Sequence, residues 1–141
     1  MPQVDFYLLP TSDEDTRLRM ICRTAEKAYS LGHRVHIHTD SNALSRRLDE
    51  LLWTFRDRSF VPHRIEPEAS DIWPVTLGRD WEPRHDDVLI NLAPRPPSFA
   101  GRFARIIEVV DQVPEVQTSG RERYRAYREL GCTLNHHSIG R

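Results

Sequence analysis

The distribution of hydrophobic residues predicts strands that alternate with helices. Apolar runs rich in strand-forming residues lie at positions 4–9, 87–93 and 105–111. Between residues 12 and 32, apolar residues recur at three- and four-residue steps, which indicates a helix with one buried face. An alternating stretch over 33–40 predicts another strand, and a stripe over 44–55 a second helix. This order is typical of an α/β fold whose mixed, mostly parallel sheet is flanked by helices.

Capping and helix-breaking residues suggest where these elements begin and end. Ser12 precedes three acidic residues and is expected to cap the first helix, which Gly32 ends. Asp40 or Ser41 is expected to cap the second helix. The sequence therefore predicts well-defined helices in the first third of the chain.

The remainder of the chain is less regular. Several prolines interrupt residues 56–86, where we expect an irregular connection with one short strand near 75–77. A short helix is expected over 98–104 and a loop over 112–120. The last helix is then expected over 121–130, where Gly131 ends it.

Length and charge exclude several classes of protein. The chain has 141 residues, and we expect residues 1–141 to form one domain. Its 20 basic and 21 acidic residues give a net charge of −1, which argues against a globally basic protein that coats nucleic acid. The first residues lack the basic start of a signal peptide, so we expect a cytoplasmic protein with no membrane contact. Cys22 and Cys132 are then expected to be reduced.

The residues that would support catalysis or bind a cofactor are missing. The first strand is followed by "PTSDED", which lacks the glycines of a nucleotide-binding loop and would repel a phosphate. His36 and His38 share one face of a strand and, with Asp40, could ligate a metal. No other cluster of histidine or cysteine lies near, so we interpret them as the polar face of an edge strand. We expect no catalytic residue, cofactor or metal.

The last predicted helix carries an unusual density of arginine. On a helical wheel one arc of about 100° contains Arg121, Tyr124, Arg125 and Arg128. The opposite side carries Ala126, Tyr127 and Leu130, through which the helix is expected to pack. Three guanidinium groups around a phenol ring suit a partner rich in carboxylates or phosphates. An acidic peptide, a nucleic-acid backbone and a merely solvated helix face all remain possible from this pattern.

Four stretches in the same order resemble the chi subunits of the bacterial DNA polymerase III holoenzyme. They are "VDFYLLP", "RLDELLWTFRDRSFVPH", "DVLINLAPRPPSFAGRFARIIEVVDQVP" and "RERYRAYRELGCTLN". The resemblance implies a Rossmann-like fold without a glycine-rich loop. It also implies a non-catalytic accessory subunit of the clamp-loader complex, which takes part in DNA replication.

The same resemblance implies two binding sites. One binds the acidic C-terminal tail of single-stranded DNA-binding protein through Arg121, Tyr124 and Arg125, with Val113 at its apolar end; Arg128 is added from the helical wheel. The other binds the psi subunit, which attaches chi to the clamp loader.

The psi-binding surface maps to Trp53, Phe60 and Pro62. Exposed aromatic residues often anchor protein interfaces, although Trp53 could instead close the core beneath the irregular connection. Direct contact with DNA is expected to be weak or absent. The rival hypotheses are a direct binder of single-stranded nucleic acid and a nucleotide-dependent α/β enzyme.

Overall fold

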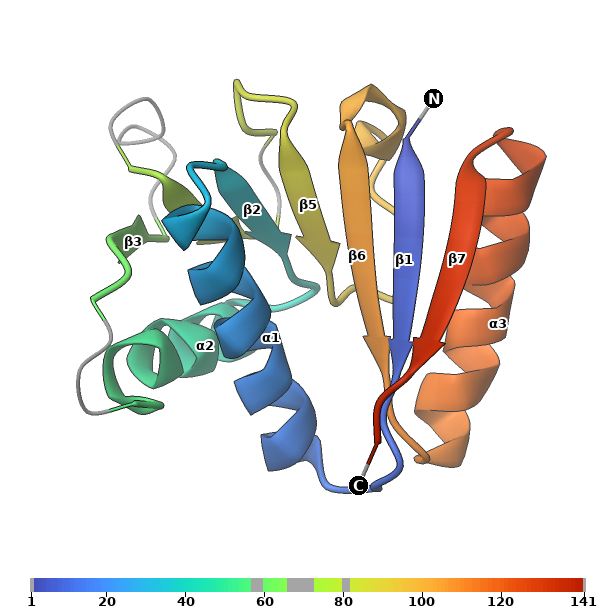
Figure 1. The fold of residues 1–141 in the computed structure, drawn as a ribbon, viewed down its shortest axis with the longest axis horizontal. Coiled ribbons are helices and arrows are strands. Elements are labelled where there is room, and N and C mark those ends of the chain that lie inside the picture. Colours follow the sequence, from blue (N-terminus) through green and yellow to red (C-terminus); the bar gives the residue numbers. More distant parts are fainter. Residues whose placement is uncertain (1, 57–59, 66–72, 80–81, 141) are drawn as a thin grey trace.

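The fold is built on one parallel sheet of seven strands. The computed structural model describes residues 2–56, 60–65, 73–79 and 82–140. In sequence order the strands are β1 (Gln3–Leu8), β2 (Val35–His38), β3 (His63–Arg64), β4 (Val75–Gly78), β5 (Val88–Asn91), β6 (Arg105–Val110) and β7 (Thr133–Ser138). Their order across the sheet is β3-β4-β2-β5-β6-β1-β7 (Figure 1). Each pair of neighbouring strands in this order runs parallel, so the predicted α/β fold class is confirmed.

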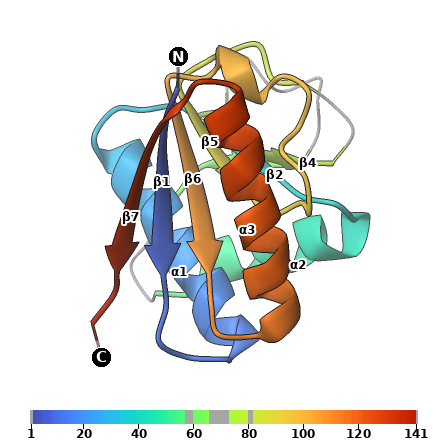
Figure 2. The ribbon, with the colours of Figure 1, turned by 90° about the vertical axis from the view of Figure 1, so that its right-hand side faces the viewer.

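Helices cover both faces of this sheet. They are α1 (Glu14–Ser30), α2 (Asn42–Thr54) and α3 (Pro114–Glu129), and a 3-10 turn, η2 (Ala100–Arg102), precedes β6. One buried cluster joins apolar residues of α1 and α2 to β2, β4 and β5, and a second joins α3 and η2 to β1 and β6. Figure 2 shows α1 and α3 on opposite sides of β1 and β6. None of the helices in the described ranges is long and apolar enough to cross a membrane.

Helix α1 follows the predicted pattern closely. Its buried residues are Leu18, Ile21, Cys22, Ala25 and Ala28, as the three- and four-residue spacing predicted. Asp13, not Ser12, caps it, because the Asp13 carboxylate accepts the backbone N–H of Asp15. Ser41 caps α2 in the same way through the N–H of Leu44.

Three predictions for the second half of the chain are wrong. Residues 114–120 are helical, because Pro114 occupies the first turn of α3, where proline is favoured. Glycine suits position 120 of α3 because the helix lies close to β6 there. A Cβ at this position would come within 3.1 Å of the Val110 side chain. The helix expected over 98–104 is only the 3-10 turn at 100–102, and β7 was not predicted at all.

Candidate functional site

A buried polar network fixes the orientation of α3 on the sheet. Glu108 of β6 is fully buried and accepts hydrogen bonds from Arg123 Nε at 2.8 Å and from the Tyr127 hydroxyl at 2.6 Å. Asn91 of β5 donates a third, at 2.9 Å. Burial raises the pKa of Glu108, and these three donors oppose that effect. Because Arg123 and Tyr127 are held against β6, the rotation of α3 about its axis is defined.

This orientation turns the predicted arginine face outward. Arg121, Arg125 and Arg128 are exposed, and Tyr124 is half-buried against Phe6 with ring centroids 5.4 Å apart. Tyr127 packs inward as predicted. Leu130 does not, because it lies past the end of α3 and is 51% exposed.

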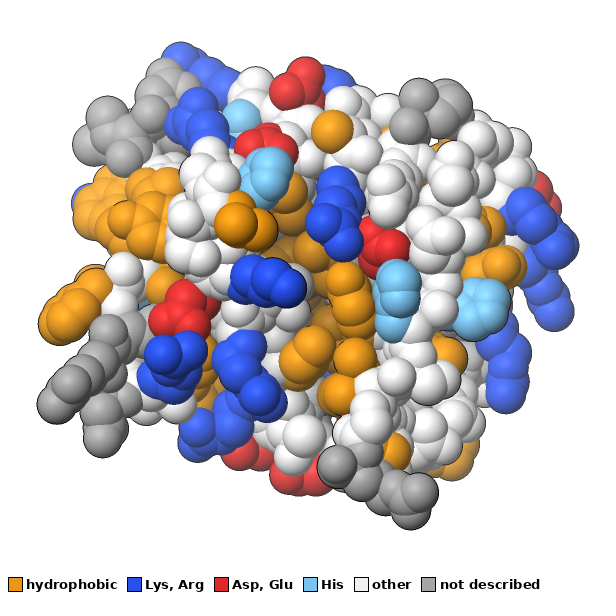
Figure 3. Space-filling model, in the orientation of Figure 1, with side chains coloured by type: hydrophobic (Ala, Val, Ile, Leu, Met, Phe, Trp, Pro, Cys, Tyr) orange, Lys and Arg blue, Asp and Glu red, His pale blue; other side chains and the backbone are white. Residues whose placement is uncertain are grey.

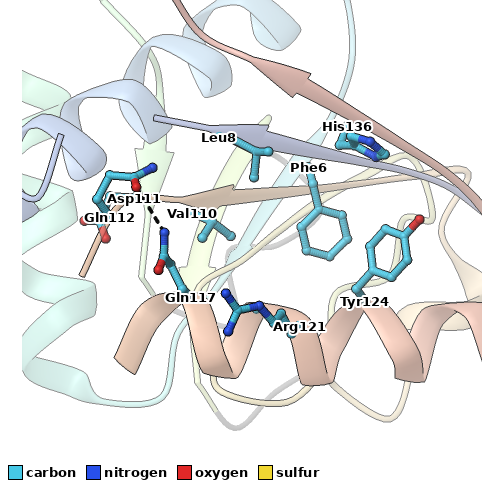
Figure 4. Close-up of a pocket in the computed structure, with 10 residues that line it drawn as sticks. Phe6, Leu8, Val110, Asp111, Gln112, Gln117, Arg121, Tyr124 and His136 are labelled. Atoms are coloured by element: carbon cyan, nitrogen blue, oxygen red, sulfur yellow. Dashed lines mark hydrogen bonds between the residues drawn. The ribbon is translucent and has the colours of Figure 1, made fainter. Parts of the chain in front are cut away.

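A pocket lies between α3 and the end of the sheet, and we call it the α3 pocket. Its volume is about 290 Å³, and it is lined by Phe6, Leu8, Val110, Asp111, Gln112, Gln117, Gly120, Arg121, Tyr124 and His136. Figure 4 shows the Arg121 side chain on α3 opposite Val110, with Tyr124 beside Phe6. The pocket therefore combines an apolar floor with a cationic side chain at its rim.

The topology of the sheet places the α3 pocket where ligands commonly bind in open α/β folds. Neighbouring strands β1 and β6 connect to α1 and α3, which cover opposite faces of the sheet. Leu8 and Val110 end these strands, so the pocket opens at their carboxyl ends. Where two neighbouring strands lead to helices on opposite faces of the sheet, a crevice remains between the two connections.

The structure brings only two of the five predicted tail-binding residues to the pocket wall. Arg121 and Tyr124 line the pocket, whereas Arg125 and Arg128 continue along the same exposed side of α3. Val113 is the residue that precedes α3, and it does not line the pocket. The branched apolar residue that lines the pocket is Val110, at the end of β6.

Two residues of the pocket were missed because of the errors in the predicted elements. Gln117 lies in the first half of α3, which was expected to be a loop, and it donates a hydrogen bond to Gln112 at 3.1 Å. His136 lies in the unpredicted strand β7. Leu134 and His136, two residues apart, share one face of this strand, but a pattern of two residues is too short to identify a strand from sequence.

The charge of the pocket is positive at its rim. The acidic residue of the pocket, Asp111, is buried. Its carboxylate lies 3.4 Å from Arg17 Nε and accepts the backbone N–H of Val113, so its charge is offset. The charge of Arg123 is likewise offset by Glu108. Within the part of the chain that the structure describes, no carboxylate forms an ion pair with Arg121, so its charge is available to a ligand.

The residues predicted to bind psi do not line the α3 pocket and lie between the end of α2 and the start of β3. We call them the Trp53 surface: Trp53, Phe60 and Pro62. Trp53 is 52% exposed and Phe60 is 80% exposed, while Pro62 is half-buried. The Trp53 ring lies against His63 of β3, with centroids 4.4 Å apart. Trp53 therefore does not close the core, which was the alternative interpretation.

The Trp53 surface and the α3 pocket lie at opposite edges of the sheet. Strand β3 is the first in the spatial order, and β7 is the last. Figure 3 shows hydrophobic side chains gathered at the β3 end, whereas Lys and Arg side chains lie along the α3 end and also over the rest of this face. Two partners could thus be held on the molecule without competing for the same surface.

The histidines that could have ligated a metal are packed in the core. Strand β2 lies between β4 and β5, so the prediction of an edge strand is wrong. His36 is fully buried, its Nδ1 lies 2.9 Å from the Thr76 hydroxyl, and Phe99 packs near both His36 and His38. Within the described ranges, no group of three or more His, Cys, Asp or Glu residues is placed to hold a metal ion.

Burial of histidines is expected to make stability depend on pH. Burial lowers the pKa of His36 to about 3 and that of His85 to about 4. In the unfolded chain both would bind protons near the ordinary pKa of about 6.5. The unfolded state therefore binds more protons below that pH, so the free energy of unfolding falls as the pH drops from about 6.5 toward 4.

Urea unfolding at about pH 7 and about pH 5 should show a loss of about 2 kcal/mol from His36 and less from the partly exposed His85. Glu108, with its raised pKa, acts in the opposite direction in wild type and variants alike. A His85→Gln variant should therefore lose less stability than wild type over this interval. Equal losses in the two proteins would contradict the assignment.

Comparisons with known proteins extend over nearly the whole chain. The family model described as "DNA polymerase III chi subunit, HolC" matches residues 1–135. The DNA polymerase III subunit chi of Pseudomonas aeruginosa is 39% identical over 142 residues, covering 100% of this chain and 99% of the relative. The subunit chi of Escherichia coli is 32% identical and covers 96% of this chain and 97% of the relative. That of Haemophilus influenzae is 31% identical and covers 96% of each. The match to the Pseudomonas aeruginosa protein covers the whole α3 pocket and the Trp53 surface, whereas the family match ends one residue before His136.

Proposed function

Because the chain belongs to the DNA polymerase III chi subunit family, whose members are replication accessory subunits, we propose that it is a non-catalytic tether within that holoenzyme. One surface binds the acidic C-terminal tail of single-stranded DNA-binding protein, and the other binds the psi subunit. Through psi, the chain is attached to the clamp loader.

The composition of the α3 pocket is the observation that carries this proposal. The tail is acidic and ends in an apolar residue with a free carboxylate. The apolar floor formed by Phe6, Leu8 and Val110 suits the last side chain, and the nearby Arg121 suits the carboxylate. Arg125 and Arg128 continue the positive charge along α3, where the acidic residues before the end of the tail would lie.

The same features favour a peptide over a nucleic acid. Backbone phosphates require positive charge but not an enclosed apolar floor, and affinity for DNA comes chiefly from many phosphate contacts. The net charge of −1 gives little long-range attraction to a polyanion. Direct contact with DNA is therefore secondary in this proposal.

The Trp53 surface is proposed as the psi-binding site because it exposes two large aromatic side chains, Trp53 near the end of α2 and Phe60 shortly before β3. Desolvating such side chains is a main source of affinity at protein interfaces. With psi bound at one edge of the sheet and the tail at the other, the chain raises the concentration of the clamp loader near protein-coated single strands.

Fluorescence polarisation with a labelled acidic peptide ending in Asp-Ile-Pro-Phe tests the proposed tail site. Arg121→Ala should weaken binding about tenfold or more, because a charge-assisted contact with the terminal carboxylate is lost. Arg125→Ala should add a smaller, salt-sensitive loss, because this side chain is exposed. Arg19→Ala is the matched control, since Arg19 carries the same charge on α1 and pairs with Asp15 at 2.7 Å.

A single-stranded DNA ligand of equal charge completes the design. The proposal expects the peptide to bind, to require its terminal Phe and to resist competition by this DNA at moderate salt. Equal competition by DNA would favour a general polyanion surface. Normal binding by Arg121→Ala would show that the α3 pocket is not the tail site.

A further inference from the structure

His136 forms the wall of the α3 pocket opposite α3. It lies beside Phe6 in the parallel pairing of β7 with β1. Leu134, two residues earlier on the same face of β7, packs in the apolar cluster beneath α3, so His136 also faces α3. The centroid of its ring lies 6.4 Å from that of Tyr124, with 65° between the two ring planes, and the residue is exposed to solvent (Figure 4).

Within the described ranges, few charged or titratable groups surround His136. From α3 it faces Arg121 and Tyr124, and from β1 it faces the uncharged Phe6. Asp111 is the acidic residue among the described residues that line the pocket. Its carboxylate already contacts Arg17 and accepts the Val113 N–H. An acidic ligand in the pocket would therefore place a carboxylate near His136, which has no carboxylate partner among the described residues of the pocket.

The neighbouring histidine lies in a different environment. His137 points to the opposite face of the sheet, where its Nε2 lies 2.9 Å from the buried Asp5 carboxylate and its ring stacks on Tyr7. Arg105 also contacts Asp5, at 2.9 Å. One strand thus carries two adjacent histidines, one with a carboxylate inside the protein and one facing the pocket.

We propose that His136 is a further binding residue for the acidic tail and that it takes up a proton from solvent when the tail occupies the α3 pocket. This inference rests on the proposed function of the pocket. With Arg121 on one wall and protonated His136 on the other, the pocket would hold carboxylates of the peptide between two cationic groups. The affinity for the tail would then increase as the pH falls through the range in which histidine titrates.

The peptide titration at about pH 8 and about pH 6 tests this proposal, because carboxylates and arginine keep their charge across this interval. Wild type should bind about fivefold more tightly at the lower pH. His136→Gln should bind with nearly equal affinity at both, and His136→Lys, with a permanent charge, should bind tightly at both. His137→Gln is the matched control and should respond to pH as wild type does.

The outcomes distinguish this inference from the function on which it rests. Tail binding with the same pH response in wild type and His136→Gln would overturn the role of His136 and leave the tail site intact. Failure of the peptide to bind at either pH would overturn both. Far-UV circular dichroism at the two pH values should show that each variant is folded, since the buried His36 and the partly exposed His85 lower stability in acid.

Discussion

Arg123→Met should lower the free energy of unfolding by about 3–5 kcal/mol, the largest effect expected of a single substitution in this chain. The reason is the buried carboxylate of Glu108, which would lose its guanidinium partner at 2.8 Å but remain enclosed by β6 and α3. Urea unfolding followed by circular dichroism at neutral pH measures the effect. Arg121→Met, on the same helix but exposed, should change stability by no more than about 0.5 kcal/mol.

A double variant separates the buried charge from lost packing. Glu108→Gln in the Arg123→Met background removes the charge while keeping the size of the side chain, and it should recover part of the lost stability. No recovery would show that Arg123 acts by packing alone. A wild-type free energy of unfolding for Arg123→Met would contradict the view that this network orients α3.

Trp53→Ala should weaken binding of the psi subunit by about 2–4 kcal/mol, or roughly thirtyfold to a thousandfold. The residue is 52% exposed in the free protein, so a partner that covers it would bury about half of its surface. Phe60→Ala, at a residue 80% exposed, should have a similar effect and is even less able to disturb the fold. Isothermal titration calorimetry with purified psi measures both changes.

The matched control is Leu31→Ala. Leu31 is 67% exposed, but it follows α1 and lines a different, small pocket, so its loss should leave psi binding unchanged. Both aromatic variants should still bind the acidic tail peptide with wild-type affinity. Unchanged psi binding in Trp53→Ala and Phe60→Ala would show that the Trp53 surface is not the psi site.

Sequence patterns defined the elements whose buried faces have a clear period. The stripe of α1 and the continuous apolar runs of β5 and β6 were predicted because burial on one or two faces fixes which positions are apolar. β7 could not be predicted in the same way. It is an edge strand with one partner and largely exposed side chains, so its sequence, "TLNHHS", has little apolar periodicity.

The candidate site was predicted in part for similar reasons. The helical wheel grouped Arg121 and Tyr124 correctly because it depends only on local geometry. It could not assign His136 or Val110, which reach the pocket through the pairing of strands far apart in sequence. It also could not show that Arg123 pairs with Glu108, since that contact depends on how α3 lies on β6.

The central claim is that this chain bridges two partners, and a sequential binding measurement tests it most directly. Single-stranded DNA coated with its binding protein is immobilised on an interferometry sensor, and psi is added with or without this chain. The proposed function predicts that psi is retained only when the chain is present, and that Arg121→Ala and Trp53→Ala each abolish retention while Arg19→Ala does not. Retention of psi without the chain, or displacement of the chain from the coated DNA by psi, would contradict the claim.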